Sequence, residues 1–257
     1  MLSSPTAIPA FRDNYIWALV EEDRCVVVDP GDAAPVEAFL DEHGLRLTAI
    51  LVTHHHPDHI GGITALLNHH DACVYGPARE TIPGCSRALV EDDHFSPEGL
   101  NLQLSVLEIP GHTLGHIAFY AAEEHWLFCG DTLFAGGCGR LFEGTPAQMY
   151  LSLHRLAALP DQTQVFCAHE YTQANLAFAA AVTPEDEAVH KRLQHVSVLR
   201  QEGRITLPTR IDLEKATNPF LRCSDTAIRH ACEEHEPGSY QNPQQCFAAL
   251  RRWKDNF

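Results

Sequence analysis

Positively charged residues are scarce in this sequence. It has 18 Lys and Arg against 34 Asp and Glu among 257 residues, which gives a formal net charge of -16 at pH 7. Binding to nucleic acid or to an anionic membrane needs clustered Lys and Arg, so we expect neither as a partner. A small anionic molecule could bind only where basic residues gather locally.

Long apolar runs and a secretion signal are also lacking. No stretch has the length needed to span a bilayer, and residues 1–6 lack the basic start and apolar run of a signal peptide. The nine cysteines are odd in number and include no Cys-x-x-Cys pair, which argues against a disulfide framework and a Cys-based zinc site. We therefore expect a cytoplasmic protein.

The hydrophobic pattern predicts an α/β layered fold. Up to about residue 170, short apolar runs alternate with turns and amphipathic stretches, and alternation of strands and helices is typical of layered α/β proteins. The predicted strands are residues 16–20, 25–28, 49–52, 102–109, 116–120, 126–129 and 164–167, with helices after residue 32 and within 142–159.

From residue 170 onward the pattern is helical. Thr183 is predicted to cap a helix that starts at Pro184, and Asn242 to cap the last one. We therefore expect two domains, residues 1–169 for catalysis and residues 170–257 as a helical domain.

The strongest chemical signal is the segment 53–59, which reads Thr-His-His-His-Pro-Asp-His directly after a predicted buried strand. Alternate side chains of an extended backbone point the same way, so His54 and His56 can converge while His55 faces away. Asp58 and His59 follow where the chain turns into a helix and aim at a neighbouring point. A lone histidine in a loop is usually a surface residue, but four candidate ligands in six residues indicate metal binding, and two directions suggest two metals.

Three later strands end in a similar way. His112, Asp131 and His169 each follow an apolar run by one to three residues. Functional groups gather beyond strand ends in α/β proteins, so these loops are predicted to meet at one rim.

These motifs resemble those of the metallo-β-lactamase superfamily. The segment 54–59 matches the superfamily's His-x-His-x-Asp-His motif, and the segments around His112, Asp131 and His169 match its later motifs in order. The resemblance implies an αββα sandwich of two mixed sheets that precedes the helical domain. It also implies that one metal binds His54, His56 and His112, that the second binds Asp58, His59 and His169, and that Asp131 bridges both.

The chain resembles one branch in particular, the glyoxalase II or hydroxyacylglutathione hydrolase family, over essentially its whole length. The segments that carry this resemblance are residues 13–15, 28–31, 134–140, 142–144, 169–172, 218–222 and 251–255. The last two lie in the helical tail, which separates this family from the rest of the superfamily.

The family resemblance also implies a glutathione site. Arg251 and Lys254 are three residues apart on one helix, so they share a face and are predicted to bind the glycine carboxylate. Arg140 and Tyr171 match positions that contact the glutathione backbone. Arg140 stands where some members carry Lys, and Phe142 where some carry Tyr, whose hydroxyl contact is then missing.

We predict hydrolysis of S-D-lactoylglutathione, and of other S-2-hydroxyacylglutathiones, to D-lactate and glutathione, which is the second step of methylglyoxal detoxification. A hydroxide between two metals roughly 3.5–4 Å apart is a strong nucleophile at neutral pH, and a metal also polarises the carbonyl. The catalytic residues are then Asp131, Asp58 and His54. The leaving thiolate departs without a dedicated acid.

Two other hypotheses remain open. A mononuclear iron dioxygenase acting on glutathione persulfide would share the fold, bind one metal and use oxygen. A non-catalytic metal or glutathione binder would bind without cleaving a thioester. The ligand types accept zinc, which we expect, and also iron or manganese. We expect a monomer that acts on a small molecule.

Overall fold

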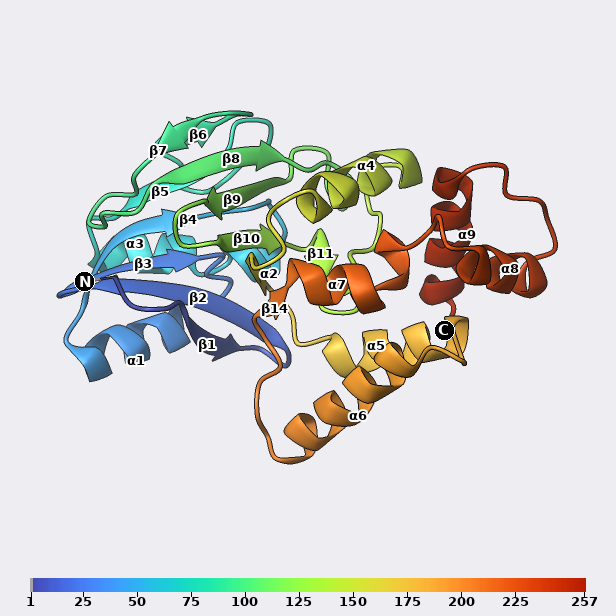
Figure 1. Cartoon of the computed structure of the whole chain (residues 1–257). Coiled ribbons are helices and arrows are strands. Elements are labelled where there is room, and N and C mark those ends of the chain that lie inside the picture. The colour runs from blue at the N-terminus through green and yellow to red at the C-terminus, as the bar shows by residue number, and fades with distance from the viewer. Residues whose placement is uncertain (1) are drawn as a thin grey trace. The chain divides into compact units, whose positions relative to one another are not determined.

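The computed structural model describes residues 2–257 and divides into two compact units (Figure 1). The first unit contains the chain up to Glu108 together with Leu114–Gly130, and the second contains Ile109–Thr113 and Asp131–Phe257. The predicted boundary between residues 169 and 170, where the sequence pattern becomes helical, stays a prediction. No helix in the described part of the chain is long and apolar enough to cross a membrane.

The first unit contains a mixed six-stranded sheet in the order β1-β2-β3-β4-β5-β6. Its first three strands are antiparallel, whereas β3 to β6 pair in parallel. The strands are β1 (Thr6–Ala10), β2 (Asn14–Glu21), β3 (Arg24–Val28), β4 (Arg46–Leu51), β5 (Cys73–Pro77) and β6 (Arg87–Leu89). The run of buried valines in β3 is typical of a central strand with both faces covered.

Helices cover one face of this sheet. They are α1 (Ala33–His43), α2 (Pro57–Ile60) and α3 (Ile63–His69), and Figure 1 shows α1 lying along the β1–β2 side. Asp32 caps α1 by accepting from the Ala34 amide. Val36 and Leu40 of α1 and Ile63 and Leu66 of α3 join one hydrophobic core with the inward side chains of the sheet.

The other face of the sheet packs on antiparallel strands of the same unit. These are β7 (His94–Phe95), β8 (Leu104–Glu108), β9 (Ile117–Ala121) and β10 (Trp126–Gly130), ordered β10-β9-β8-β7. Tyr75 of β5 stacks on Phe95 of β7 with 4.8 Å between ring centroids, and Phe95 lies edge-on to Phe119 of β9. The first unit therefore has two sheets packed face to face, as the predicted sandwich requires.

The second unit is mainly helical. Its elements are β11 (Leu133–Phe134), β12 (Gly137–Cys138), α4 (Pro146–Ala157), β13 (Gln164–Cys167), α5 (Thr172–Val182), α6 (Glu187–Gln201), β14 (Thr209–Arg210), α7 (Ile211–Thr217), the short 3₁₀ helix η1 (Pro219–Leu221), α8 (Thr226–His235) and α9 (Pro243–Asp255). Thr145 and Gln148 form a capping box at α4, and Asn242 caps α9 as predicted.

The predicted start of α6 is wrong. The helix begins at Glu187, and Asp186 caps it by accepting from the amides of Ala188 and Val189. Thr183 instead ends α5, where its hydroxyl donates to the Ala179 carbonyl. Asp186 is the cap because its carboxylate lies within reach of two helical amides, whereas the Thr183 hydroxyl already donates to a carbonyl of the preceding helix.

Leu40→Ala tests the packing of α1. Leu40 is 2% exposed in the core, whereas Leu151 of α4 is 59% exposed and serves as a matched helical control. Removing a buried leucine leaves a cavity, so Leu40→Ala should lower the free energy of unfolding by about 2–5 kcal/mol. Leu151→Ala should change it by less than about 0.5 kcal/mol in the same urea titration. Equal effects of the two changes would contradict this packing.

Candidate active site

Four predicted ligands of the first unit gather where β4 ends and α2 begins. His54 Nε2 lies 3.2 Å from His56 Nδ1, and the rings of His54 and His59 are 4.1 Å apart. His59 Nε2 lies 3.6 Å from a carboxylate oxygen of Asp58. His54 and His59 are fully buried, while His56 and Asp58 are partly exposed. The predicted alternation along residues 54–56 is confirmed.

The buried carboxylate of Asp29 anchors this group. One of its oxygens accepts from the Thr53 hydroxyl at 2.7 Å and lies 3.1 Å from His59 Nδ1, and the other accepts from the Thr53 amide. Since the Thr53 hydroxyl gives its proton to Asp29, its contact with His54 Nδ1 at 3.1 Å requires the proton to sit on that nitrogen. His54 thus keeps its Nε2 unprotonated, which is the form that binds metal.

Gly31, two residues after Asp29, lies against the backbone of Asp58. A side-chain carbon at Gly31 would lie 1.9 Å from the carbonyl oxygen of Asp58, so only glycine fits there. Asn14 of β2 donates to the Asp58 carboxylate at 3.0 Å and sets its direction. These contacts give physical roles to Asn14, Asp29 and Gly31, which lie in the segments 13–15 and 28–31.

Two further histidines lie close by with other roles. His55 points away as predicted, and its amide and Nδ1 bind the buried carboxylate of Glu80 at 2.6 and 2.9 Å. His116 stacks on His54 with 4.5 Å between centroids and its Nδ1 bonds to the Ile117 carbonyl. Glu80 was not predicted, because nothing in its local sequence marks it.

The three remaining predicted ligands gather in the second unit. An oxygen of the Asp131 carboxylate lies 3.5 Å from His112 Nε2 and 3.3 Å from His169 Nε2. His112 Nδ1 donates to the carbonyl oxygen of Arg140 at 2.8 Å, which leaves its Nε2 unprotonated. All three residues are at least nine-tenths buried. One carboxylate oxygen therefore faces two imidazoles.

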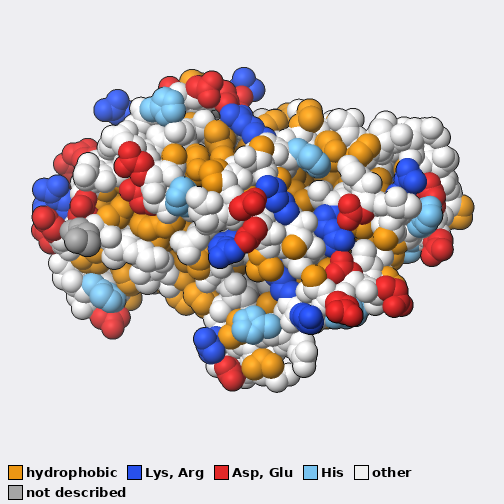
Figure 2. Space-filling view, viewed as in Figure 1, with side chains coloured by type: hydrophobic (Ala, Val, Ile, Leu, Met, Phe, Trp, Pro, Cys, Tyr) orange, Lys and Arg blue, Asp and Glu red, His pale blue; other side chains and the backbone are white. Residues whose placement is uncertain are grey.

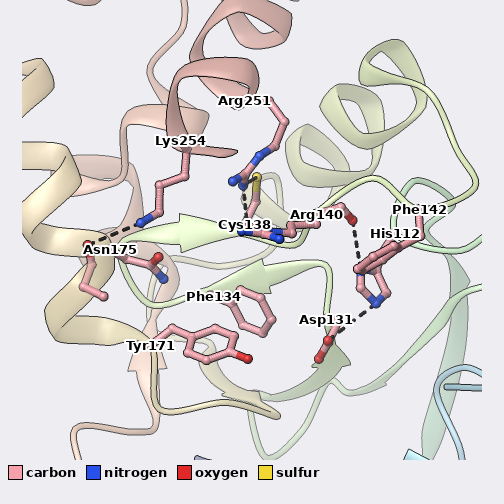
Figure 3. Close-up of a pocket in the computed structure, with 11 residues that line it drawn as sticks. His112, Asp131, Phe134, Cys138, Arg140, Phe142, Tyr171, Asn175, Arg251 and Lys254 are labelled. Carbon is pink, nitrogen blue, oxygen red and sulfur yellow. Dashed lines mark hydrogen bonds and ion pairs between the residues drawn. The ribbon is translucent and has the colours of Figure 1, made fainter. Parts of the chain in front are cut away.

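A pocket of about 390 Å³ in the second unit opens beside these residues (Figure 3). Its lining includes every residue that was predicted to bind the substrate. Its lining is His112, Asp131, Phe134, Cys138, Arg140, Phe142, Tyr171, Ala174, Asn175, Arg251 and Lys254. Phe134 stands edge-on to both the His169 and Tyr171 rings, and it and Asn175 were not singled out from the sequence.

Arg251 and Lys254 both point from α9 to this pocket, as their shared helical face predicted (Figure 3). Arg251 is buried, and its guanidinium donates to Asp255 and to the Cys138 carbonyl at 2.9 Å. Lys254 is half-buried and lies over the Phe178 ring. Burial, together with the positive charges of Arg251 and Arg140, lowers the pKa of Lys254.

The pocket concentrates positive charge in an acidic protein. Arg140, Arg251 and Lys254 line it, whereas Asp131 is its one acidic lining residue. On the face drawn in Figure 2, basic and acidic side chains are interspersed. Cys138 is not an alternative nucleophile, because burial raises the pKa of its thiol to about 11. The pocket therefore suits an anionic small molecule, and the imidazole and carboxylate groups beside it suit divalent metals.

Two family models match the chain and together span most of it. The model described as metallo-beta-lactamase superfamily matches residues 10–169, and the model described as hydroxyacylglutathione hydrolase C-terminus matches residues 170–257.

Relatives match over nearly the full length. The chain is 54% identical over 255 residues to a hydroxyacylglutathione hydrolase of Pseudomonas paraeruginosa, covering 98% of each chain. It is 57% identical over 251 residues to one of Alkalilimnicola ehrlichii, covering 97% of each. Among solved structures, ETHE1 from Myxococcus xanthus superposes with a TM-score of 0.63 at 26% identity, covering 96% of this chain and 98% of that one.

Thr53→Val tests the anchoring of the imidazoles. Valine keeps the shape of threonine but removes the hydroxyl between Asp29 and His54, so the affinity for Zn²⁺ should fall about 10- to 100-fold. Competition with a chromophoric chelator measures this affinity. Thr53→Ser, which keeps the hydroxyl, should bind zinc nearly as the unaltered chain does. Unchanged affinity in Thr53→Val would show that the hydroxyl does not orient a ligand.

Proposed function

This chain belongs to the hydroxyacylglutathione hydrolase family of the metallo-β-lactamase superfamily, and we propose that it hydrolyses S-D-lactoylglutathione and related S-2-hydroxyacylglutathiones to the free hydroxy acid and glutathione. It is a thioester hydrolase with the predicted metallo-β-lactamase fold and a helical C-terminal part. The observation that carries the proposal is the cationic pocket whose lining includes Asp131 and His112.

We propose that His54, His56 and His112 bind one metal, that Asp58, His59 and His169 bind the second, and that Asp131 bridges both. The position of Asp131 supports the bridging role. One of its two carboxylate oxygens, Oδ2, faces the Nε2 atoms of both His112 and His169, and this scheme assigns those two histidines to different metals. The fixed Nδ1 protons of His54 and His112 support their roles as Nε2 ligands.

Zinc is the metal that we propose for both positions, because imidazole nitrogen and carboxylate oxygen are its usual ligands, although iron and manganese accept the same set. We further propose a cytoplasmic monomer that binds neither nucleic acid nor membrane. The nine free cysteines suit a reducing compartment, and the charge of -16 opposes polyanionic partners.

The metals, when bound, supply an activated water and a positive charge for the oxyanion that forms on the thioester carbonyl. We propose that Asp131 accepts a proton from the attacking water and that Asp58 and His54 are further catalytic groups. Arg251 and Lys254 attract the glycine carboxylate of glutathione, and the buried Arg251 is held rigid by Asp255. Arg140, Tyr171 and Phe142 contact the rest of the peptide. The leaving thiolate needs no proton donor.

We propose that residues 1–169 carry the metal chemistry and residues 170–257 complete the glutathione site. The iron dioxygenase alternative is less well supported, because the full-length relatives at 54–57% identity are named hydroxyacylglutathione hydrolases. A non-catalytic binder would not need seven metal ligands beside a substrate-sized pocket.

Asp131→Ala tests the function and the bridging role together. The unaltered chain should hydrolyse S-D-lactoylglutathione and contain two metals per chain. The alanine variant should lose at least about 10³-fold in kcat and contain less metal, because the shared ligand and proton acceptor are gone. Asp161→Ala, at an exposed aspartate, is the control and should behave as the unaltered chain does. Full activity of Asp131→Ala would refute the assignment, and one iron per chain with oxygen consumption would favour the dioxygenase.

The pH dependence of substrate binding tests Lys254. Its pKa is lowered chiefly by burial, so its ammonium is lost at a lower pH than that of an exposed lysine. At pH 7 the KM of Lys254→Met should exceed that of the unaltered chain about 10-fold. The two KM values should converge as the pH rises through the Lys254 pKa, and Lys254→Arg should delay the convergence to higher pH. A KM ratio independent of pH would exclude a charge interaction.

A further inference from the structure

Glu214 is a fully buried carboxylate in α7 that no step above uses. Four donors converge on it. Gly136 N and Asn218 Nδ2 donate to its Oε2 at 2.7 and 3.0 Å, and Arg192 Nη2 and Thr209 Oγ1 donate to its Oε1 at 2.5 and 2.6 Å. The two oxygens thus face different neighbours, one the chain around Gly136 and the other a buried arginine.

Gly136 belongs to residues 133–140, which contain the β11–β12 hairpin and end at Arg140; we call this segment the 133–140 loop. Its backbone is tied to helical residues at several further points. Asn218 Nδ2 donates to the carbonyls of Phe134 and Gly137, Asn175 Nδ2 to that of Ala135, and Arg251 Nη1 to that of Cys138. Side chains from beyond residue 170 therefore hold most of this loop.

The end of the same loop reaches two functional groups. The Arg140 carbonyl accepts from His112 Nδ1, so the position of the loop sets the direction of a proposed metal ligand. The Gly139 amide donates to the Thr132 carbonyl, and a side-chain carbon at Gly139 would lie 1.9 Å from the Asp131 carbonyl oxygen. A displaced loop would thus move Arg140 and His112 together and press on the backbone of Asp131.

We propose that Glu214 and Asn218 are positioning residues: they hold the 133–140 loop so that Arg140 faces the substrate and His112 faces the metal. The proposal rests on the proposed function for the substrate and deepens it. A buried ion pair adds little stability over apolar packing, so stability alone does not require this arrangement. A need to hold the 133–140 loop in one position does account for the arrangement, because Glu214 and Asn218 hydrogen-bond directly to its backbone.

Glu214→Gln distinguishes the two oxygens. Glutamate has two acceptor oxygens, whereas glutamine has one acceptor oxygen and one donor amide. We expect the charged Arg192 to keep the single oxygen of the glutamine on its side. The new amide then faces two donors, Gly136 N and Asn218 Nδ2, and the loop loses its anchor. Thr209→Val is the matched control, because it removes a bond to the other oxygen and leaves the loop bonds intact.

Asn218→Ser gives a second route to the same loop. A serine hydroxyl can still cap η1 by accepting from the Phe220 amide, as Asn218 does. It is too short to donate to the carbonyls of Phe134 and Gly137. Should Glu214→Gln fail to fold, this variant decides the question by itself.

The measurements are the KM and kcat for S-D-lactoylglutathione, Zn²⁺ affinity by chelator competition, and Tm. Glu214→Gln and Asn218→Ser should each raise KM about 10-fold and weaken zinc binding about 10-fold, as expected when a partner behind a ligand is lost. Thr209→Val should lower Tm while KM and zinc affinity stay within twofold of the unaltered chain.

If the KM and zinc affinity of Glu214→Gln and Asn218→Ser matched those of Thr209→Val, the proposal would be overturned, because the network would then be only structural. Equal losses in all three variants would overturn it too. If the unaltered chain does not hydrolyse the thioester, the proposed function fails, but the zinc affinities still decide whether Glu214 and Asn218 position His112.

Discussion

A histidine binds metal through one ring nitrogen only when the proton is held on the other, and the candidate site is built around that constraint. In the first unit Asp29 anchors His59 directly and His54 through a threonine hydroxyl. In the second unit the end of the 133–140 loop anchors His112 through a backbone carbonyl. Asp29 and Arg140 both lie outside the segments that supply the proposed ligands. The surrounding fold therefore has to place both the ligands and the groups behind them.

Substrate binding in this acidic protein also depends on a few side chains that the fold holds in place. The net charge of -16 gives no long-range attraction, so affinity depends on a few cations placed where solvent is limited. Lys254 is half-buried, and Arg251 is fixed by Asp255 and a backbone carbonyl, so little side-chain freedom is lost on binding. The 133–140 loop contributes Arg140 to the same pocket. One loop of the second unit thus supports both a proposed metal ligand, His112, and a proposed substrate-binding residue, Arg140.

Much of the fold and of the candidate site was predictable from the sequence. The pattern that made the prediction possible differs between residues. Strand alternation was enough to place His54 and His56 on one side and His55 on the other. Helical periodicity was enough to put Arg251 and Lys254 on one face. Glu80 and Glu214 were not predictable, because their partners lie up to 78 residues away and no local pattern marks them. The α6 cap was missed because Thr183 and Asp186, three residues apart, could each cap a helix, and only the folded backbone decides between them.

The central claim is that two metals are bound by one shared set of ligands. X-ray absorption spectroscopy of the chain loaded with two equivalents of zinc tests it most directly. The account predicts a ligand shell of nitrogen and oxygen only, together with zinc–zinc scattering at roughly 3.5–4 Å. A spectrum without a second metal at that distance, or a chain that binds only one equivalent, would contradict it.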